Sequence, residues 1–122
     1  MSNIIMSEEE INEVLNQFEQ YIAKRKPLRV VVTWGGVGFY QVLNKFGQLQ
    51  NVYYVAITAR PQVKNAPEFA IRLPSGPIAG DGPDRFGEVL EKYGYEQKDR
   101  WGAIGHWNYL FQRKKVRVKK NE

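Results

Sequence analysis

The chain has 122 residues, 43% of them hydrophobic, which is enough for one core that buries about two-thirds of the unfolded surface. Lys and Arg outnumber Asp and Glu by 18 to 13, an excess that favours anionic partners. The absence of cysteine excludes disulfides, thiolate metal sites and cysteine nucleophiles. We expect a single compact domain over residues 1–122, with a basic C-terminal segment that could form a flexible tail.

The charge is unevenly distributed along the chain. Five glutamates are the only charges before Lys24, so the remainder carries 18 basic and 8 acidic residues, a net charge of +10. An anionic partner is therefore expected to avoid the N-terminal segment. Residues 1–6 lack the pattern of a signal peptide, and no apolar run approaches the roughly 20 residues that span a bilayer. These features predict a soluble cytoplasmic protein with no membrane contact.

The first predicted element is an amphipathic helix that begins after Ser7. Ser7 and Glu10 have the spacing of a capping box. Pro27 is expected to end the helix, after a basic run at 24–26 that suits the C-terminal end of the helix dipole. The apolar side chains recur at spacings of three and four, which places them on one helix face: Ile11, Val14, Leu15, Phe18 and Ile22.

Residues 28–34 predict a strand that is central or covered on both faces, because three consecutive valines occupy 30–32. The residues after the following glycine cluster favour a helix. Phe39, Val42, Leu43 and Phe46 lie at i, i+3, i+4 and i+7, and Gly47 would end the helix. Read as a strand, residues 39–44 show no clean alternation of apolar and polar side chains. A tight strand meander through the glycine cluster is the alternative.

In the rest of the chain, segments with a strand or helix pattern alternate with segments that show no regular spacing of apolar residues. Residues 52–58 predict a strand, 60–67 a loop and 68–73 a shorter strand, and the prolines and glycines of 74–83 predict a long loop. A second helix should begin near Pro83 and end at Gly94, because its apolar residues repeat the helical spacing: Phe86, Val89, Leu90 and Tyr93. Residues 95–105 show no sustained period and predict a loop or a broken helix. Strand spacing returns from His106, and Val116 and Val118 alternate with basic residues.

Together these elements predict an α+β fold with a mostly antiparallel sheet of three to five strands and amphipathic helices packed on one face. A small α/β unit with a parallel βαβ crossover between residues 34 and 52 is the alternative. The oligomeric state cannot be read from the pattern.

Two glycine-containing loops are candidate anion sites, because each is predicted to precede a helix. Free N–H groups at a helix N-terminus bind anions, and glycine lets a phosphate approach the backbone. Neither loop completes a dinucleotide fingerprint or a P-loop, and a structural turn is the preferred reading of both. Asp81 would repel a phosphate and could instead cap the second helix. The glycines concerned are Gly35, Gly36, Gly38, Gly80 and Gly82.

The basic C-terminal segment is the strongest functional feature of the sequence. Six positive side chains within eight positions could neutralise several phosphates without reading base sequence. The alternatives are protection of an exposed edge strand and a solvated tail. The residues are Arg113, Lys114, Lys115, Arg117, Lys119 and Lys120.

An aromatic stripe precedes this segment, since Trp107, Tyr109 and Phe111 alternate and so share one sheet face. Exposed rings would stack on unpaired bases, whereas buried rings would be core residues, and burial is the preferred reading.

Catalysis receives little support. His106 is the only histidine, so a histidine cluster for a metal is impossible, and neither a metal nor a cofactor is expected. His106 could act as an acid or base beside Glu96 or Asp99, but a structural role fits it as well. The carboxylates of Asp81 and Asp84 are explained by a loop and a cap. Four arginines could contact phosphate, with surface ion pairs as the expected alternative: Arg60, Arg72, Arg85 and Arg100.

The preferred function is a noncatalytic binding protein for nucleic acid or another phosphate-rich ligand, which uses the basic C-terminal segment with help from the aromatic residues. The first alternative is a small inhibitor or adaptor that covers an acidic protein surface. The second is a protein that binds or sequesters a small nucleotide through the glycine loops and arginines.

Overall fold

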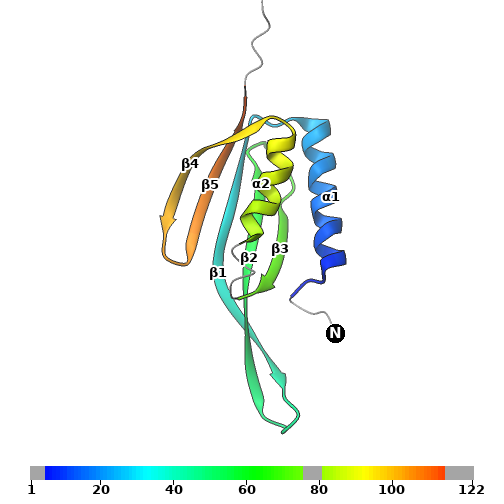
Figure 1. Cartoon of the computed structure of the whole chain (residues 1–122), viewed down its shortest axis with the longest axis vertical. Helices are drawn as coiled ribbons and strands as arrows, with labels where there is room; N and C mark the ends of the chain where they lie inside the picture. The colour runs from blue at the N-terminus through cyan, green and yellow to red at the C-terminus, as the bar shows by residue number, and fades with distance from the viewer. Residues whose placement is uncertain (1–4, 76–80, 115–122) are drawn as a thin grey trace, which may run out of the picture.

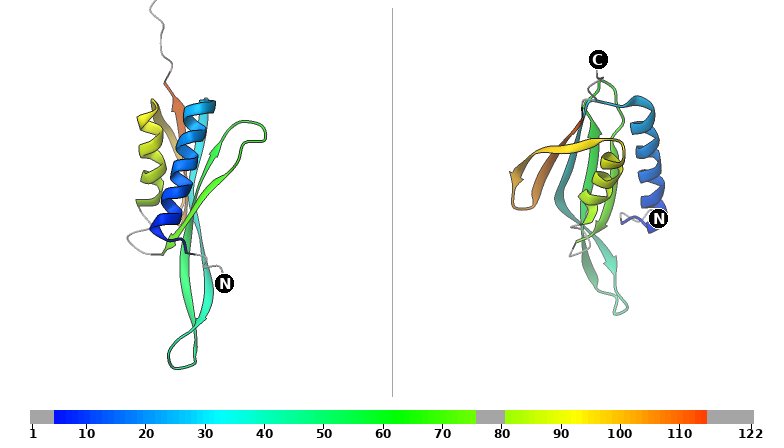
Figure 2. Two further views of the ribbon diagram at one scale, coloured as in Figure 1. Left: turned by 90° about the vertical axis from the view of Figure 1, so that its right-hand side faces the viewer. Right: turned by 45° about the horizontal axis from the view of Figure 1, so that its top comes forward.

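The computed structural model describes residues 5–75 and 81–114, which form an antiparallel sheet with two helices packed on one of its faces (Figures 1 and 2). The elements in chain order are α1 (Glu8–Arg25), β1 (Arg29–Leu43), β2 (Leu49–Pro61), β3 (Phe69–Pro74), α2 (Gly82–Lys92), β4 (Tyr95–Ala103) and β5 (His106–Arg113). The sheet has five strands in the order β3-β2-β1-β5-β4, and each neighbouring pair is antiparallel. The α+β prediction is confirmed. The parallel-crossover alternative is wrong, because a hairpin joins β1 directly to β2.

Both helices form where the sequence predicts them. The capping box of α1 is complete: the Glu10 N–H donates to Ser7 Oγ at 3.1 Å and the Ser7 N–H donates to Glu10 Oε1 at 2.9 Å. Lys26 ends α1 in the left-handed conformation, with φ of 46°, and Pro27 follows it. In α2, Pro83 lies in the first turn, and Gly94 follows the helix with φ of 87°.

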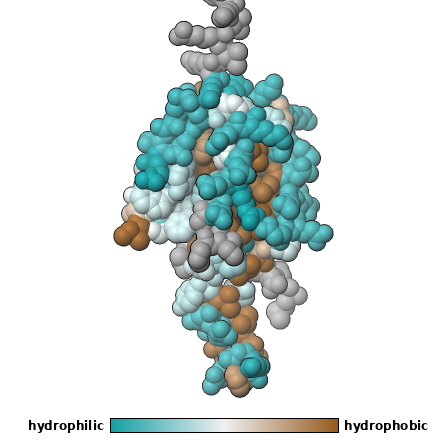
Figure 3. All heavy atoms as spheres, viewed as in Figure 1, coloured by the Kyte–Doolittle hydropathy of each residue, from teal (hydrophilic) through white to brown (hydrophobic). Residues whose placement is uncertain are grey.

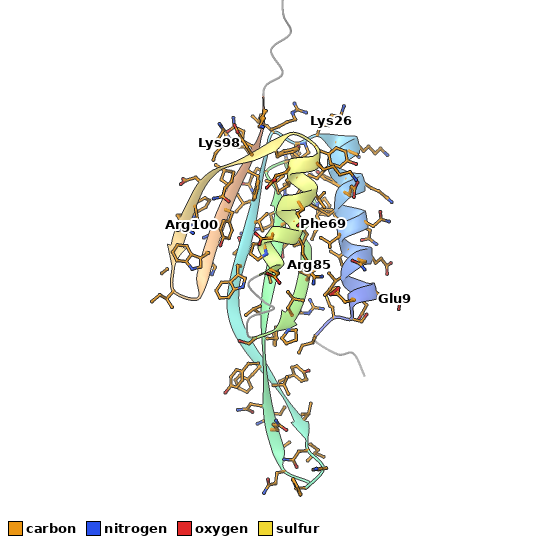
Figure 4. The ribbon with its side chains drawn as sticks, in the orientation of Figure 1. Glu9, Lys26, Phe69, Arg85, Lys98 and Arg100 are labelled. Atoms are coloured by element: carbon orange, nitrogen blue, oxygen red, sulfur yellow. The ribbon has the colours of Figure 1, made fainter. Side chains whose placement is uncertain are left out.

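The hydrophobic core lies between the helices and one face of the sheet. Phe18 of α1 is fully buried and packs edge-on against Phe69 of β3 and Phe86 of α2, with ring centroids 5.2 and 5.0 Å apart. In Figure 4, Phe69 is labelled in the region between α2 and α1. Val32 of β1 is also fully buried and pairs with Ala59 of β2. Because paired residues share a face, the register places one continuous set of apolar side chains beneath the helices.

The helix predicted over residues 39–46 does not form. Strand β1 instead continues through the glycine cluster to Leu43 and pairs with β2 to its end, Leu43 opposite Leu49. Beyond Gly35 the strand has no β5 beside it, so residues 38–53 form a two-stranded projection, here called the arm (Figure 1). Neither face of the arm is covered by the helices. No burial requirement therefore imposes the alternation by which a strand is recognised.

Residues 95–105 are also not a loop or broken helix, because most of them form β4, which pairs with β5 along its whole length. Tyr95 is the only buried residue of β4, and the residues after it are half-buried or exposed. Without a core-facing side, an edge strand of polar residues leaves no periodic signal in the sequence. The strand predicted from His106 is confirmed as β5, whereas Val116 and Val118 lie outside the described residues.

Candidate functional site

Three segments that are distant in sequence end at the same end of the molecule. The C-termini of α1, α2 and β5 all lie there, and Figure 4 shows Lys26 at this end, on the α1 side. We call the basic residues of these termini the basic end. They are Lys24, Arg25, Lys26, Lys92, Arg113 and Lys114.

An open pocket of about 830 Å³ lies within the basic end. Its apolar surface comes from α1, from the segment after it and from the start of β4. None of its lining residues is acidic and four are basic. The lining residues are Ile22, Lys26, Leu28, Lys92, Tyr93, Gly94, Tyr95, Arg113 and Lys114.

Hydrogen bonds fix the end of β5 against both helices. The Arg113 guanidinium donates to the Lys26 carbonyl at 3.0 Å, and the Lys114 N–H donates to the Gly94 carbonyl at 2.9 Å. The buried Tyr95 hydroxyl donates to the Pro27 carbonyl, and burial raises the pKa of Tyr95. The start of the predicted basic segment is thus held beside the C-terminus of α1.

The basic side chains of the basic end differ in whether they form an ion pair. Lys92 lies 2.7 Å from Glu19, which also accepts a hydrogen bond from the Tyr93 hydroxyl at 2.9 Å. Hydrogen bonds from Lys92 and Tyr93 lower the pKa of Glu19 and keep it ionised. Lys26 and Lys114 form no ion pair with any carboxylate in the described part of the chain. Their charges remain open to an external anion.

The structure therefore joins two predicted residues, Arg113 and Lys114, to two that sequence reasoning did not include, Lys26 and Lys92. Sequence reasoning assigned Lys26 only to the end of the first helix. Its spatial role depends on the sheet order, which brings β5 beside β1. Four predicted residues lie outside the described residues: Lys115, Arg117, Lys119 and Lys120.

The aromatic stripe divides between core and surface. Phe111 is a core residue, 6% exposed, so its ring cannot receive a base. Tyr109 and Trp107 are half-buried and line a separate pocket of about 310 Å³ together with Trp34. The Arg100 guanidinium lies 4.9 Å from the centroid of Trp107. The six-residue step from Trp107 to Arg113 along β5 corresponds to about 20 Å, so the Trp107 ring lies apart from the basic end.

An acidic groove separates these two regions. It has a volume of about 370 Å³, and α2 contributes three carboxylates to it: Asp84, Glu88 and Glu91. Tyr109 and Phe111 of β5 line its other side. A phosphate backbone that followed this face from the basic end to Trp107 would be repelled by these charges.

The structure places the first glycine cluster in a strand and describes only part of the second glycine loop. Gly35, Gly36 and Gly38 lie within β1, which no helix follows, so the helix N-terminus required for phosphate binding is absent there. Gly82 is buried at the start of α2, and a Cβ there would lie 2.5 Å from Ile57 Cδ1. Gly80 lies outside the described residues. Asp81 occupies the N-cap position without a capping side-chain hydrogen bond, contrary to the cap suggested for it.

His106 lies at the start of β5, and its ring packs against Gly35, where a Cβ would lie 2.6 Å from Nδ1. In the described part of the chain no hydrogen bond joins it to Glu96 or Asp99. Glu96 instead lies 2.6 Å from Lys98, and Asp99 accepts the Arg100 N–H at 2.8 Å. Neither carboxylate is therefore oriented by a hydrogen bond to His106 in the described structure.

Of the candidate arginines, Arg85 forms a two-pronged ion pair with Glu8, with both distances 2.9 Å, as the ion-pair alternative predicts. Arg60 lines a shallow pocket of about 430 Å³ with Trp101 and Asn108. The alternation of β5 places Asn108 on the opposite sheet face from Trp107 and the core.

The chain matches no family of known proteins, no curated protein and no solved structure. Neither of the helices in residues 5–75 and 81–114 combines the length and apolar character needed to cross a bilayer.

Proposed function

We propose that this is a noncatalytic binding protein that engages nucleic acid through phosphate contacts at the basic end. One observation carries the proposal: basic residues at the C-terminal ends of α1, α2 and β5 converge on a single open pocket, and none of the described residues that line it is acidic. Charge contributed by three separate elements forms a surface, whereas a solvated tail would place its charge on one segment alone.

The unpaired cations give this surface its capacity for phosphate. Lys26 and Lys114 line the pocket without an ion-pair partner among the described residues, whereas the charge of Lys92 is offset by Glu19. Two helices also end here, and part of the positive charge offsets the negative ends of their dipoles. Lys114 belongs to neither helix. The Lys98 hydrogen bond and the charges of Lys98 and Lys114 lower the pKa of Glu96, so Lys114 has an acidic neighbour but no ion pair among the described residues.

Affinity for nucleic acid is expected to come from contacts between basic side chains and phosphates, and not from stacking of aromatic rings on bases. Phe111 is buried, and the acidic groove along α2 lies between Trp107 and the basic end. Phosphate contacts of this kind position a backbone without reading its sequence. The protein should therefore bind with little sequence preference.

The test is fluorescence anisotropy of labelled single-stranded and duplex oligonucleotides, titrated with protein between roughly 50 and 200 mM salt. We expect affinity that falls as salt rises and that is lost on joint replacement by Gln of Arg113, Lys114, Lys115, Arg117, Lys119 and Lys120. Unchanged binding by that variant would reject the surface. Absence of oligonucleotide binding, with a protein partner that survives nuclease treatment, would favour the adaptor hypothesis instead.

A further inference from the structure

The arm has apolar side chains that stay exposed among residues 5–75 and 81–114. Phe39, Phe46 and Tyr53 are 54%, 75% and 51% exposed. Three aliphatic residues of the arm are exposed as well: Val42, Leu43 and Leu49. Lys45 is the only charged residue between positions 36 and 56. Figure 3 shows hydrophobic patches along the arm beside hydrophilic ones, whereas the surface at the opposite end of the molecule is mainly hydrophilic.

This exposed area is comparable to the largest apolar patch of an ordinary monomer, which is often a functional surface. An aromatic side chain buries about 150–250 Å² when it is covered, so the exposed parts of Phe39, Phe46 and Tyr53 correspond to roughly 270–450 Å². The exposed aliphatic residues enlarge the apolar patch of the arm, and Phe39, Val42 and Leu43 bring part of it onto β1. A free patch of this size marks an interaction surface, and a two-stranded hairpin is marginally stable until a further strand joins it.

The β1 edge of the arm also presents unpaired backbone groups. The Asn44 N–H donates to the Gln48 carbonyl at 2.9 Å, and bonded pairs alternate along an antiparallel ladder. The register therefore bonds Val42 to Gln50 and Tyr40 to Val52, while the backbone groups of Phe39, Gln41 and Leu43 point outward. The same alternation directs the Tyr53 carbonyl away from β1, where it accepts the Ser75 N–H at 3.1 Å.

We infer that two copies of this chain pair antiparallel along the β1 edges of their arms, about a twofold axis at Gln41. The axis places Phe39 opposite the partner's Leu43, Tyr40 opposite the partner's Val42, and Gln41 opposite its own copy. The outward groups of residues 39, 41 and 43 then bond across the axis, and apolar side chains face one another. The two arms become a four-stranded sheet, and a twofold axis makes the interface self-complementary.

A second copy fits this edge better than the anionic partners expected of the basic end. An edge without charge from residue 36 to 44 offers an anion nothing to pair with, but it creates no repulsion against an identical edge. The arm also extends away from the basic end (Figure 1). Antiparallel pairing therefore keeps the positively charged bodies of the two copies apart.

The test is the molar mass of the full chain in solution, by sedimentation equilibrium from low-micromolar to submillimolar concentration. We expect a concentration-dependent dimer. The double variant Phe39→Lys/Leu43→Lys sets like charges opposite each other twice and should weaken the dimer about tenfold or more. The double variant Phe39→Lys/Leu43→Glu sets opposite charges together under the same axis and should associate more strongly than the Lys/Lys variant.

Ile104→Lys is the matched control, because Ile104 is a fully exposed apolar residue in the β4–β5 turn, outside the arm. It should leave the dimer unchanged, and circular dichroism confirms that each variant is folded. A wild-type protein that stays monomeric throughout would overturn the inference. Equal weakening by the Lys/Lys and Lys/Glu variants would also overturn it, because only the proposed axis brings residues 39 and 43 together.

Discussion

At the scale of single residues, the glycine cluster of β1 bends the strand and does not bind an anion. Gly35 pairs with Ala56 and Gly38 pairs with Tyr54, so two residues of β1 oppose one of β2 and form a bulge. Gly36 has φ of +71°, a conformation that glycine adopts without strain. At Gly38 a Cβ would lie 2.7 Å from the Tyr54 ring. These glycines allow the arm to leave the body of the sheet.

The first prediction concerns Gly36, whose missing Cβ would meet no atom within 4 Å. Backbone strain is therefore the expected effect of a side chain there. Gly36→Ala should lower the free energy of unfolding by about 1–2 kcal/mol, because an alanine resists positive φ. Gly36→Asn should lose less, since asparagine tolerates this region better. Urea unfolding followed by circular dichroism measures both, and equal losses would contradict the assigned strain.

At the scale of elements, one ion pair near each end of α2 connects this helix to α1. Arg85 of α2 reaches Glu8 near the start of α1, and Lys92 of α2 reaches Glu19 further along α1. Figure 4 shows Arg85 on the side of α2 that faces α1. The Arg85 guanidinium lowers the pKa of Glu8, as Lys92 and Tyr93 lower that of Glu19. Both carboxylates therefore bind protons less readily in the folded state than in the unfolded state.

The lowered pKa values of these carboxylates predict that the stability of the fold depends on pH. A carboxylate whose folded pKa lies below its unfolded value stabilises the fold above the ordinary value of 4.5, and the contribution is lost as pH falls through the folded pKa. Glu19→Gln should therefore make unfolding less dependent on pH in the acid range. Glu13→Gln, at an exposed position of the same helix, is the control. Thermal unfolding from pH 7 to pH 3 tests this, and parallel curves for wild type and Glu19→Gln would refute it.

The elements differ in how far the sequence predicts them, for a physical reason. Helix α1 and most of α2 pack one face on the core, so burial imposes a spacing that the sequence records. The arm exposes most of its side chains, and β4 buries only Tyr95 at its start. In the arm, Phe39 and Val42 can be apolar because partner contacts, not the core, are proposed to cover them. Their three-residue spacing is typical of a helix, although no packing against the core requires it.

At the scale of the whole molecule, the basic end and the arm lie at opposite extremes (Figure 1). The start of the basic segment was predictable, because Arg113 and Lys114 belong to a dense run of charge. The participation of Lys26 was not predictable, because it requires β5 to lie beside β1 and to end level with the C-terminus of α1. Because the two surfaces are far apart, phosphate binding at the basic end and pairing through the arm are expected to be independent. Loss of arm pairing should leave each copy able to bind phosphate.

The most direct measurement is the salt dependence of oligonucleotide affinity for Lys114→Gln and Lys45→Gln. Both variants lose one positive charge, but Lys114 lines the pocket of the basic end and Lys45 lies in the turn of the arm. The account predicts that the slope of log affinity against log salt falls by about 1 for Lys114→Gln, as for one lost phosphate contact, and stays unchanged for Lys45→Gln. Equal slopes for wild type and both variants would contradict it.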